Sequence, residues 1–246
     1  MKLITNSTYL TFILFLIFSY GCFRNPEDCE GTQDGSAYID KCGGCVGGIT
    51  NLEACVDEDE DGFDDRDMTF LQDLRAIMPN AINMDLFNIG EEVWRGGRLI
   101  YFEGILDALS GEIPESISDL THIEHLNISG NYQLTGEIPS EIGNLVTLEE
   151  LHLYNNQLNG VIPESIGNLS NLFLLFLSNN QLSGSIPESI GSLDNLYLLF
   201  LTNTNVSGDI PSSIGNLINL TWLILSNNQI TSIPESISDL TNLYIF

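Results

Sequence analysis

Residues 148–169 read LEELHLYNNQLNGVIPESIGNL, and the same pattern recurs from residue 99 to residue 246. Its copies begin at Leu99, Ile123, Leu148, Leu172, Leu196, Leu220 and Leu243, with spacings of 24, 25, 24, 24, 24 and 23 residues. Self-similarity at a fixed period of roughly 20–50 residues is typical of a solenoid, in which each copy buries its apolar side against its neighbours. The repeat therefore predicts one continuous core that is built layer by layer.

The first half of each copy has the pattern of a strand followed by a turn. In the third copy, Leu148, Leu151 and Leu153 alternate with polar residues, which predicts a strand with one buried face. Asn156 follows where the chain must turn, and we expect its buried amide to pair backbone groups that the turn leaves without partners. The counterparts of this asparagine are Asp107, Asn131, Asn180 and Asn228, with Thr204 as the exception.

Glycine and proline recur at fixed places in the second half of each copy. The glycines fit a tight backbone position, and they are Gly111, Gly136, Gly160, Gly184 and Gly208. Proline prevents a regular α-helix and favours extended or 3-10 structure on the outer side, and its positions are Pro114, Pro139, Pro163, Pro187, Pro211 and Pro234. The last full copy is one residue short before Ile233, so its outer side should differ locally.

Aligned on their first apolar residue, the copies read L-x-x-L-x-L-x-x-N-x-L-x-G-x-I-P-x-x-I-x-x-L. This pattern resembles the leucine-rich repeat family, in its plant-type 24-residue subclass with the G-x-I-P signature. The resemblance covers residues 99–246, as six copies and a truncated seventh. It implies an α/β solenoid with a concave parallel β-sheet and an irregular or 3-10 convex side. Plant-type repeats of this kind occur in receptor ectodomains and in inhibitors of cell-wall hydrolases.

The first 21 residues are typical of a signal peptide, which would direct the protein to secretion or to the cell surface. Residues 9–18, YLTFILFLIF, form an apolar run that is too short to span a bilayer as a helix. Gly21 before Cys22 resembles the cleavage box of bacterial lipoproteins, so we expect a lipid on Cys22, with ordinary signal cleavage as the alternative.

Residues 22–56 form a cysteine-rich spacer. If Cys22 carries lipid, the other four cysteines can form two disulfides, in any of three pairings, and they are Cys29, Cys42, Cys45 and Cys55. A redox pair or half a zinc site at Cys42 and Cys45 remains as an alternative. The segment resembles short cysteine-rich stretches in secreted proteins of marine and environmental bacteria, which implies a stalk.

The acidic linker, residues 57–67, has the oxygen-rich spacing of a calcium loop. The expected Ca²⁺ ligands are Asp57, Asp59, Asp61 and Asp65, with the carbonyl of Phe63. An EF-hand would need Glu where Met68 stands. The linker is therefore more similar to thrombospondin type 3 repeats or half a dockerin loop, and a solvated acidic linker is the alternative.

Residues 68–98 are expected to cap the first repeat. Apolar residues recur at helical spacing up to Pro79 and are Met68, Leu71, Leu74, Ile77 and Met78. Asp67 is the expected N-cap of this helix. The cap would be completed by Phe87, Ile89, Val93 and Trp94. A helix in this place would cover the exposed end of the solenoid.

The formal charge of −27, from 34 acidic and 7 basic residues, limits the choice of partners. Nucleic acid is excluded as a partner because Lys and Arg must neutralise its phosphates. Electrostatic docking on an anionic membrane is equally disfavoured, so membrane attachment is expected only through the lipid or the signal peptide.

Alternate strand positions should point to solvent on the concave side, where neighbouring strands lie about 4.8 Å apart. The later copies place an apolar patch there, consisting of Phe173, Leu174, Phe176, Tyr197, Leu198, Phe200, Trp222 and Ile224, with Tyr154 and His152 beside it. Exposed apolar patches usually mark interaction sites. We therefore predict a module that binds a protein, peptide or glycan, with self-association as a structural or adhesive protein as the alternative.

The second and third copies instead present glutamates and histidines. His125, Glu150 and His152 should be neighbours, so an enzyme or a weak metal site is a remote alternative. The sequence places no nucleophile or second metal-binding motif with them, and we therefore do not expect an enzyme. The seventh copy breaks off at residues 243–246 without a capping segment, which predicts that the chain is part of a longer protein.

Overall fold

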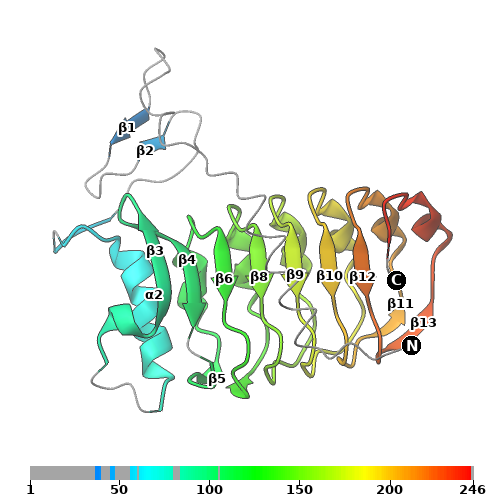
Figure 1. Ribbon diagram of the computed structural model, residues 1–246, viewed down its shortest axis with the longest axis horizontal. Coiled ribbons are helices and arrows are strands. Elements are labelled where there is room, and N and C mark those ends of the chain that lie inside the picture. Colours follow the sequence, from blue (N-terminus) through cyan, green and yellow to red (C-terminus); the bar gives the residue numbers. More distant parts are fainter. Residues whose placement is uncertain are drawn as a thin grey trace.

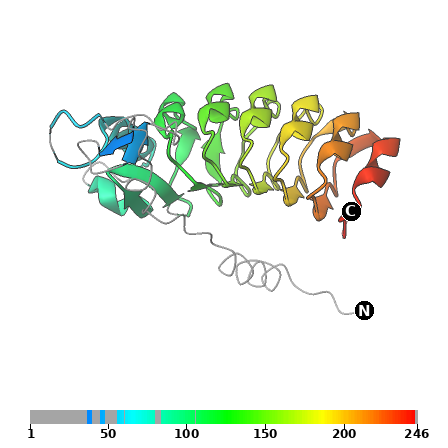
Figure 2. The ribbon, with the colours of Figure 1, turned by 90° about the horizontal axis from the view of Figure 1, so that it is seen from above.

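The computed structural model describes residues 37–39, 45–47, 56–59, 61–79, 84–104 and 106–244. Its main body is an elongated solenoid in which strands stand side by side along one face (Figure 1). They form a seven-stranded sheet in the order β12-β10-β9-β8-β6-β4-β3. Short helical turns follow the opposite, outer side of a gentle arc (Figure 2). The predicted α/β solenoid with a parallel sheet is confirmed.

Each of the six full copies of the repeat contributes one strand to this sheet. The strands are β4 (Arg98–Gly104), β6 (His125–Asn127), β8 (Glu150–His152), β9 (Leu174–Phe176), β10 (Leu198–Phe200) and β12 (Trp222–Ile224). All neighbours among these six pair in parallel, and Leu151 pairs with Leu126 on one side and Leu175 on the other. All three leucines are fully buried. The constant period therefore places the same core position of every copy in one column.

Buried asparagines form the expected ladder at the turn after each strand. The side-chain amide of Asn180 donates to the carbonyls of Leu153 and Leu177, and its oxygen accepts the N–H of Leu158. Thr204 fills the same place with a hydroxyl that donates to Asn228. The ladder thus satisfies backbone groups that the turn would leave buried and unpaired.

The expected first member of that ladder, Asp107, was wrong. Asp107 is exposed and has a φ of 57°, which places it in the left-handed turn rather than in the core. The backbone N–H groups of Ala108 and Leu109 donate to the side-chain oxygen of Asn131 in the next copy. The ladder therefore begins with Asn131.

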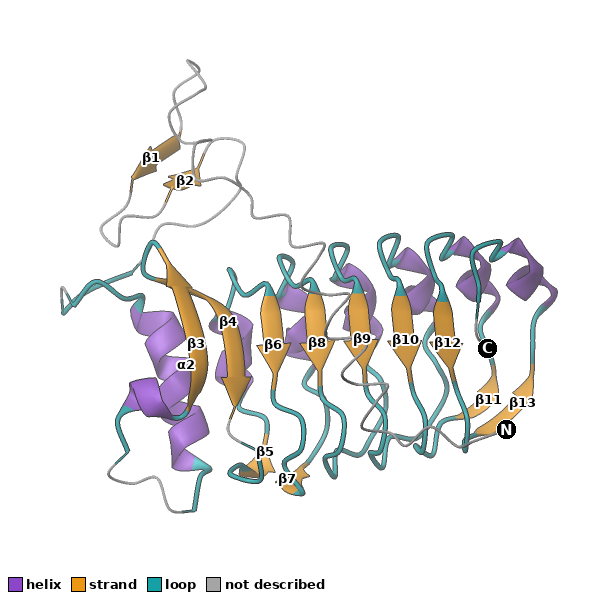
Figure 3. Cartoon of the chain, in the orientation of Figure 1, coloured by secondary structure: helices purple, strands orange, loops and turns teal. Residues whose placement is uncertain are grey.

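The outer side consists of one 3-10 turn per copy, as the prolines predicted (Figure 3). These turns are η4 (Glu115–Asp119), η5 (Ser140–Asn144), η6 (Glu164–Asn168), η7 (Glu188–Ser192), η8 (Ser212–Asn216) and η9 (Glu235–Asp239). Each is preceded by a proline in extended conformation, with φ from −64° to −72°. Stacking is tight, because a Cβ at Gly143 would lie 2.5 Å from the Ser165 carbonyl oxygen.

Two further pairs of strands lie between the sheet and the 3-10 turns. β5 (Ser110–Glu112) pairs with β7 (Gln133–Thr135), and β11 (Ser207–Asp209) pairs with β13 (Gln229–Ser232). The register of the second pair shifts between Gly208 and Asp209. This shift confirms that the shortened last full copy differs locally.

The N-terminal cap contains helix α2 (Asp65–Ala76), the 3-10 turn η3 (Leu86–Asn88) and β3 (Gly90–Arg95), which pairs antiparallel with β4. Phe70 of α2 packs edge-to-face on Phe102 of the first repeat, with ring centroids 5.9 Å apart. Ile89 is buried with them, whereas Phe87 and Val93 are exposed. The helix therefore closes the end of the core, as expected.

The predicted N-cap of this helix was wrong. Asp64 is the N-cap, and its side chain accepts from the backbone N–H of Arg66. Asp67 lies inside the first turn, fully buried, and binds the guanidinium of Arg98 through two hydrogen bonds of 2.9 and 3.0 Å. The carboxylate is thus committed to the first repeat rather than to the end of its own helix.

The described residues of the N-terminal region include β1 (Ala37–Ile39) and β2 (Cys45–Gly47), which pair antiparallel. The predicted signal peptide, the lipidation site Cys22 and the disulfide candidates Cys29, Cys42 and Cys55 lie outside the described residues. For Cys45 the description is limited to its place in β2.

Candidate ligand-binding face

The side of the seven-stranded sheet that points away from the core is called the sheet face below. Strand alternation places two rows of side chains on it, and the parallel register aligns them across the repeats. One row is Tyr101, His125, Glu150, Leu174, Leu198 and Trp222, and the other is Glu103, Asn127, His152, Phe176, Phe200 and Ile224. The structure thus brings the predicted ligand-binding residues of different copies together on one surface.

The later strands carry a second apolar cluster, separate from the main core. We call it the aromatic cluster; it consists of Tyr154, Leu174, Phe176, Leu198, Phe200 and Trp222. The rings of Phe176 and Phe200 meet edge-to-face at 4.8 Å, and those of Phe200 and Trp222 lie 6.2 Å apart. The cluster is therefore continuous from the end of β8 across β9 and β10 to β12.

Three members of the cluster are less exposed than expected. Leu174 is 0% exposed, Leu198 5% and Phe176 8%, although the sequence pattern predicted that they point into solvent. Large rings on strands about 4.8 Å apart cover the smaller side chains between them. A ligand can therefore contact the solvent-facing side of the aromatic rings, which cover the buried side chains between them.

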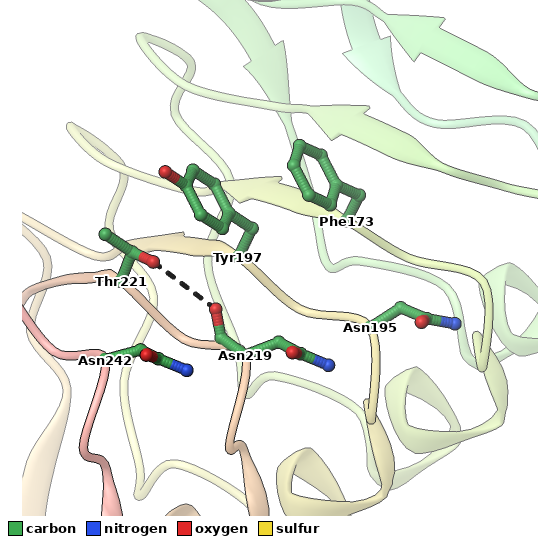
Figure 4. Close-up of a pocket in the computed structure, with 6 residues that line it drawn as sticks. All are labelled: Phe173, Asn195, Tyr197, Asn219, Thr221 and Asn242. Carbon is green, nitrogen blue, oxygen red and sulfur yellow. Dashed lines mark hydrogen bonds between the residues drawn. The ribbon is translucent and has the colours of Figure 1, made fainter. Parts of the chain in front are cut away.

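A stacked aromatic pair and a row of asparagines border the cluster. Phe173 and Tyr197 stack with ring centroids 4.9 Å apart and an interplanar angle of 5°, and they remain 39% and 38% exposed. They line a shallow pocket of about 530 Å³ (Figure 4), together with Asn195, Asn219, Thr221 and Asn242. This edge offers exposed rings beside amide groups.

The apolar pattern of the sheet face did not predict these asparagines. Their amides donate to carbonyls one repeat earlier, for example from Asn195 to Ser170 and from Asn219 to Asp194, each at 2.8 Å. The sequence does carry a signal for them, because an asparagine directly precedes the first leucine of four consecutive copies, at Asn171, Asn195, Asn219 and Asn242.

Two histidines flank one carboxylate next to the aromatic cluster. Glu150 lies 3.5 Å from Nδ1 of His125 through Oε1 and 3.2 Å from Nε2 of His152 through Oε2. Burial opposes ionisation of Glu150, but hydrogen bonds from both histidines lower its pKa to about 2. Burial likewise opposes protonation of His125, but the hydrogen bond to Glu150 and the nearby carboxylates raise its pKa.

This arrangement stabilises the negative charge of Glu150. Within the part of the chain that the structure describes, neither His125 nor His152 hydrogen-bonds a serine, threonine or cysteine. The ring of His152 instead packs on Phe176, with centroids 4.7 Å apart. The two histidines and Glu150 therefore form the polar boundary of the aromatic cluster.

The N-terminal end of the sheet face is acidic. Glu91 of β3 stands directly opposite Glu103 of β4, and both line a hollow of about 300 Å³ with Asn88, Gly90 and Gly104. The repeat pattern does not predict this pair of glutamates, because residues 90–95 precede the first copy. The antiparallel pairing of β3 is what brings them together.

The expected calcium loop is partly assembled. One carboxylate oxygen of each of Asp57, Asp59 and Asp61 lies within 4.8 Å of the others, so these three residues could hold a metal ion. Asp65 lies in the first turn of α2 and accepts the N–H of Glu58 instead. The ring of Phe63 contacts Phe87 and Trp94 at 5.0 and 4.8 Å, which ties the loop to the cap.

Comparison with known proteins links the repeats to a family. Profiles described as leucine-rich repeat match residues 146–206, 122–145 and 219–240. No curated protein sequence matches the chain. Among the described residues, no helix combines the length and the apolar character needed to cross a membrane.

Solved structures of plant proteins resemble the chain. The ectodomain of the receptor kinase GASSHO1/SCHENGEN3 from Arabidopsis thaliana, in complex with CASPARIAN STRIP INTEGRITY FACTOR 2, is 42% identical over 56% of this chain and 17% of that chain, with a TM-score of 0.54. The Arabidopsis receptor kinase HAESA, in complex with the peptide hormone IDA and the co-receptor SERK1, is 40% identical over 56% of this chain and 23% of that chain, with a TM-score of 0.53. The present chain thus spans less than a quarter of either ectodomain.

A shorter structure is matched over nearly its whole length. A chain of the BIR3–SERK2 complex from Arabidopsis thaliana is 33% identical, with a TM-score of 0.57. The match covers 70% of the present chain and 96% of that chain.

Proposed function

The chain belongs to the leucine-rich repeat family, and from this premise we propose that it is a non-enzymatic module that binds a protein or peptide on its sheet face. The observation that carries the proposal is the aromatic cluster. Phe200 and Trp222 lie on the solvent side of the sheet, where the fold itself does not need large rings. Rings in such positions supply much of the binding free energy at protein interfaces.

The structural neighbours support a polypeptide ligand. HAESA is described in complex with a peptide hormone and a co-receptor, and BIR3 in complex with SERK2. The cluster extends over strands β8 to β12, at about 4.8 Å per strand, which suits an extended segment that crosses several repeats. A glycan would instead rely on the asparagines beside Phe173 and Tyr197.

The test is capture of partners by the immobilised full chain. Phe200→Ala and Trp222→Ala should each weaken capture by about tenfold or more, the usual cost of removing an interface anchor. Tyr132→Ala is the matched control, because Tyr132 is 59% exposed and lies outside the seven-stranded sheet. Unchanged capture by both cluster variants would refute the proposal. Concentration-dependent sedimentation of the chain on its own would instead favour self-association.

Export and tethering complete the proposal. Residues 1–21 would act as the signal peptide, Cys22 would carry a lipid, and the other four cysteines would stabilise a short stalk by disulfides. The binding module would then stand at the cell surface. The mass of the mature N-terminus would distinguish lipidated Cys22 from ordinary signal cleavage.

A further inference from the structure

The sheet face is divided into an acidic half and an uncharged half. On the sheet face, strands β3, β4, β6 and β8, together with the residues just before β6 and β8, carry Glu91, Glu103, Glu124, Glu149 and Glu150. Of the basic groups there, Arg95 is paired with Glu124 at 2.9 Å, His125 and His152 are paired with Glu150, and Arg98 is buried. Strands β9, β10 and β12 carry no charged residue and present the aromatic cluster. A partner that fits both halves must itself be divided, with cationic groups at one end and apolar groups at the other.

The acidic half has a defined place for a cation. Glu91 and Glu103 face each other across β3 and β4, an arrangement of like charges that destabilises a sheet. Glu103 is held in position by the hydroxyl of Tyr101, which donates to it at 2.7 Å, and by the amide of Asn127 at 3.2 Å. The hollow that the two carboxylates line has room for an ammonium or guanidinium group. A cation bound there would relieve the repulsion between them.

The distance between the two halves sets the length of the partner segment. Four strand-to-strand steps of about 4.8 Å separate β4 from β10, which gives roughly 19 Å. An extended chain covers that distance with about six residues at about 3.3 Å each. One continuous segment can therefore reach from the Glu91–Glu103 hollow to Phe200.

We infer that the ligand of the sheet face is an extended polypeptide segment that places a Lys or Arg side chain between Glu91 and Glu103 and, about six residues away, aromatic or aliphatic side chains on the aromatic cluster. This inference rests on the proposed function and adds the chemistry of the ligand to it. A second copy of the chain does not supply that chemistry, because 34 acidic residues outnumber 7 basic ones. Anionic membranes and nucleic acids are repelled by the same carboxylates.

Selection of random peptides on the immobilised full chain tests the inference without a known partner. We expect enriched peptides to combine Lys or Arg with aromatic or aliphatic residues at a separation of five to seven positions. For an enriched peptide, the double variant Glu91→Gln/Glu103→Gln should weaken binding about three- to fivefold per carboxylate, and added salt should weaken wild-type binding in parallel.

The matched control is Glu115→Gln/Glu164→Gln, which removes the same charge from the exposed outer side. Equal weakening by both double variants would overturn the assigned cation site, because it would show only the general field of the chain. The selection could instead enrich peptides that lack basic residues and whose binding depends on Phe200 but not on Glu91 or Glu103. That result would overturn this inference and leave the proposed function standing. A selection that enriches no peptide would count against both.

Discussion

At the scale of single residues, Arg98 shows how one side chain joins segments that are distant in sequence. Its guanidinium is 2% exposed and contacts Asp64 at 3.3 Å and Asp67 at 2.9 Å, both from the cap. It also donates to the hydroxyl of Thr121, which precedes the second copy. The cap is thus attached to the solenoid by a buried ion pair as well as by apolar packing.

Breaking this pair should destabilise the fold strongly. Asp67→Ala would leave the Arg98 charge buried without its main partner, so we expect the free energy of unfolding to fall by about 3–5 kcal/mol. Urea denaturation measures the change. Arg95→Ala is the control, because its exposed pair with Glu124 should contribute less than about 1 kcal/mol. Equal effects of the two substitutions would show that burial of the Arg98 pair does not matter.

The histidine–glutamate cluster predicts a bell-shaped pH dependence of stability. Folding raises the pKa of His125 above its ordinary 6.5, so its contribution is full below about pH 6.5 and is lost as pH rises through the folded value. Folding lowers the pKa of Glu150 from 4.5 to about 2, so its contribution is present above about pH 4.5 and is lost as pH falls. Glu150→Gln should therefore destabilise the protein most between about pH 4.5 and 6.5.

Chemical denaturation at acidic, intermediate and alkaline pH checks this window. The groups that face His125 and Glu150 are Tyr101, Glu124, Glu149 and His152. Glu137→Gln serves as the control, because Glu137 is exposed and distant from the sheet face, and its effect should not peak in that window. A destabilisation by Glu150→Gln that is constant from pH 4 to 9 would contradict the assignment.

At the scale of elements, the asparagine ladder should carry a measurable part of the stability. Asn180→Ala would leave the carbonyls of Leu153 and Leu177 and the N–H of Leu158 without their partner, and we expect a loss of about 1–3 kcal/mol. The neighbouring Asn179 is exposed with a φ of 57°, a conformation that glycine adopts readily. Asn179→Gly is therefore the control: it removes only exposed hydrogen bonds, to Asn155 and from Asn203, and should lower stability less than Asn180→Ala does. A larger loss of stability in Asn179→Gly than in Asn180→Ala would contradict the stabilising role of the buried ladder.

The acidic loop before α2 gives a prediction for calcium. Binding of Ca²⁺ by Asp57, Asp59 and Asp61 would stabilise the folded loop, whose Phe63 packs on the cap. We therefore expect Ca²⁺ to raise the melting temperature, and Asp57→Asn/Asp59→Asn to abolish the rise. Asp194→Asn/Asp209→Asn controls for the loss of exposed charge. A rise that survives in the loop variant would show that calcium acts elsewhere.

The elements also show what a single sequence can reveal. The 3-10 turns followed from Pro163 and its counterparts, because proline fixes one backbone angle wherever it stands. The N-cap did not follow, since Asp64 and Asp67 are both carboxylates at the start of the helix. What distinguishes them is the pair of hydrogen bonds that Arg98 donates to Asp67, and no local pattern points to a partner 31 residues away.

At the scale of the whole molecule, the period predicted more of the sheet face than any single residue did. It aligned Leu174, Leu198 and Trp222 correctly, because each copy adds one strand in the same register. It did not predict that Leu174 is buried, which depends on the rings packed around it. Nor did it predict the Glu91–Glu103 hollow, because β3 lies outside the repeat and runs antiparallel.

Binding of a polypeptide on the aromatic cluster can be measured through the fluorescence of Trp222, which is part of that cluster. The chain has two tryptophans, so Trp94→Phe leaves Trp222 as the only reporter. We predict that a saturating amount of a selected peptide without tryptophan shifts the Trp222 emission to shorter wavelength and protects it from quenching by acrylamide. Unchanged emission and quenching at saturation would place the ligand elsewhere and contradict the account.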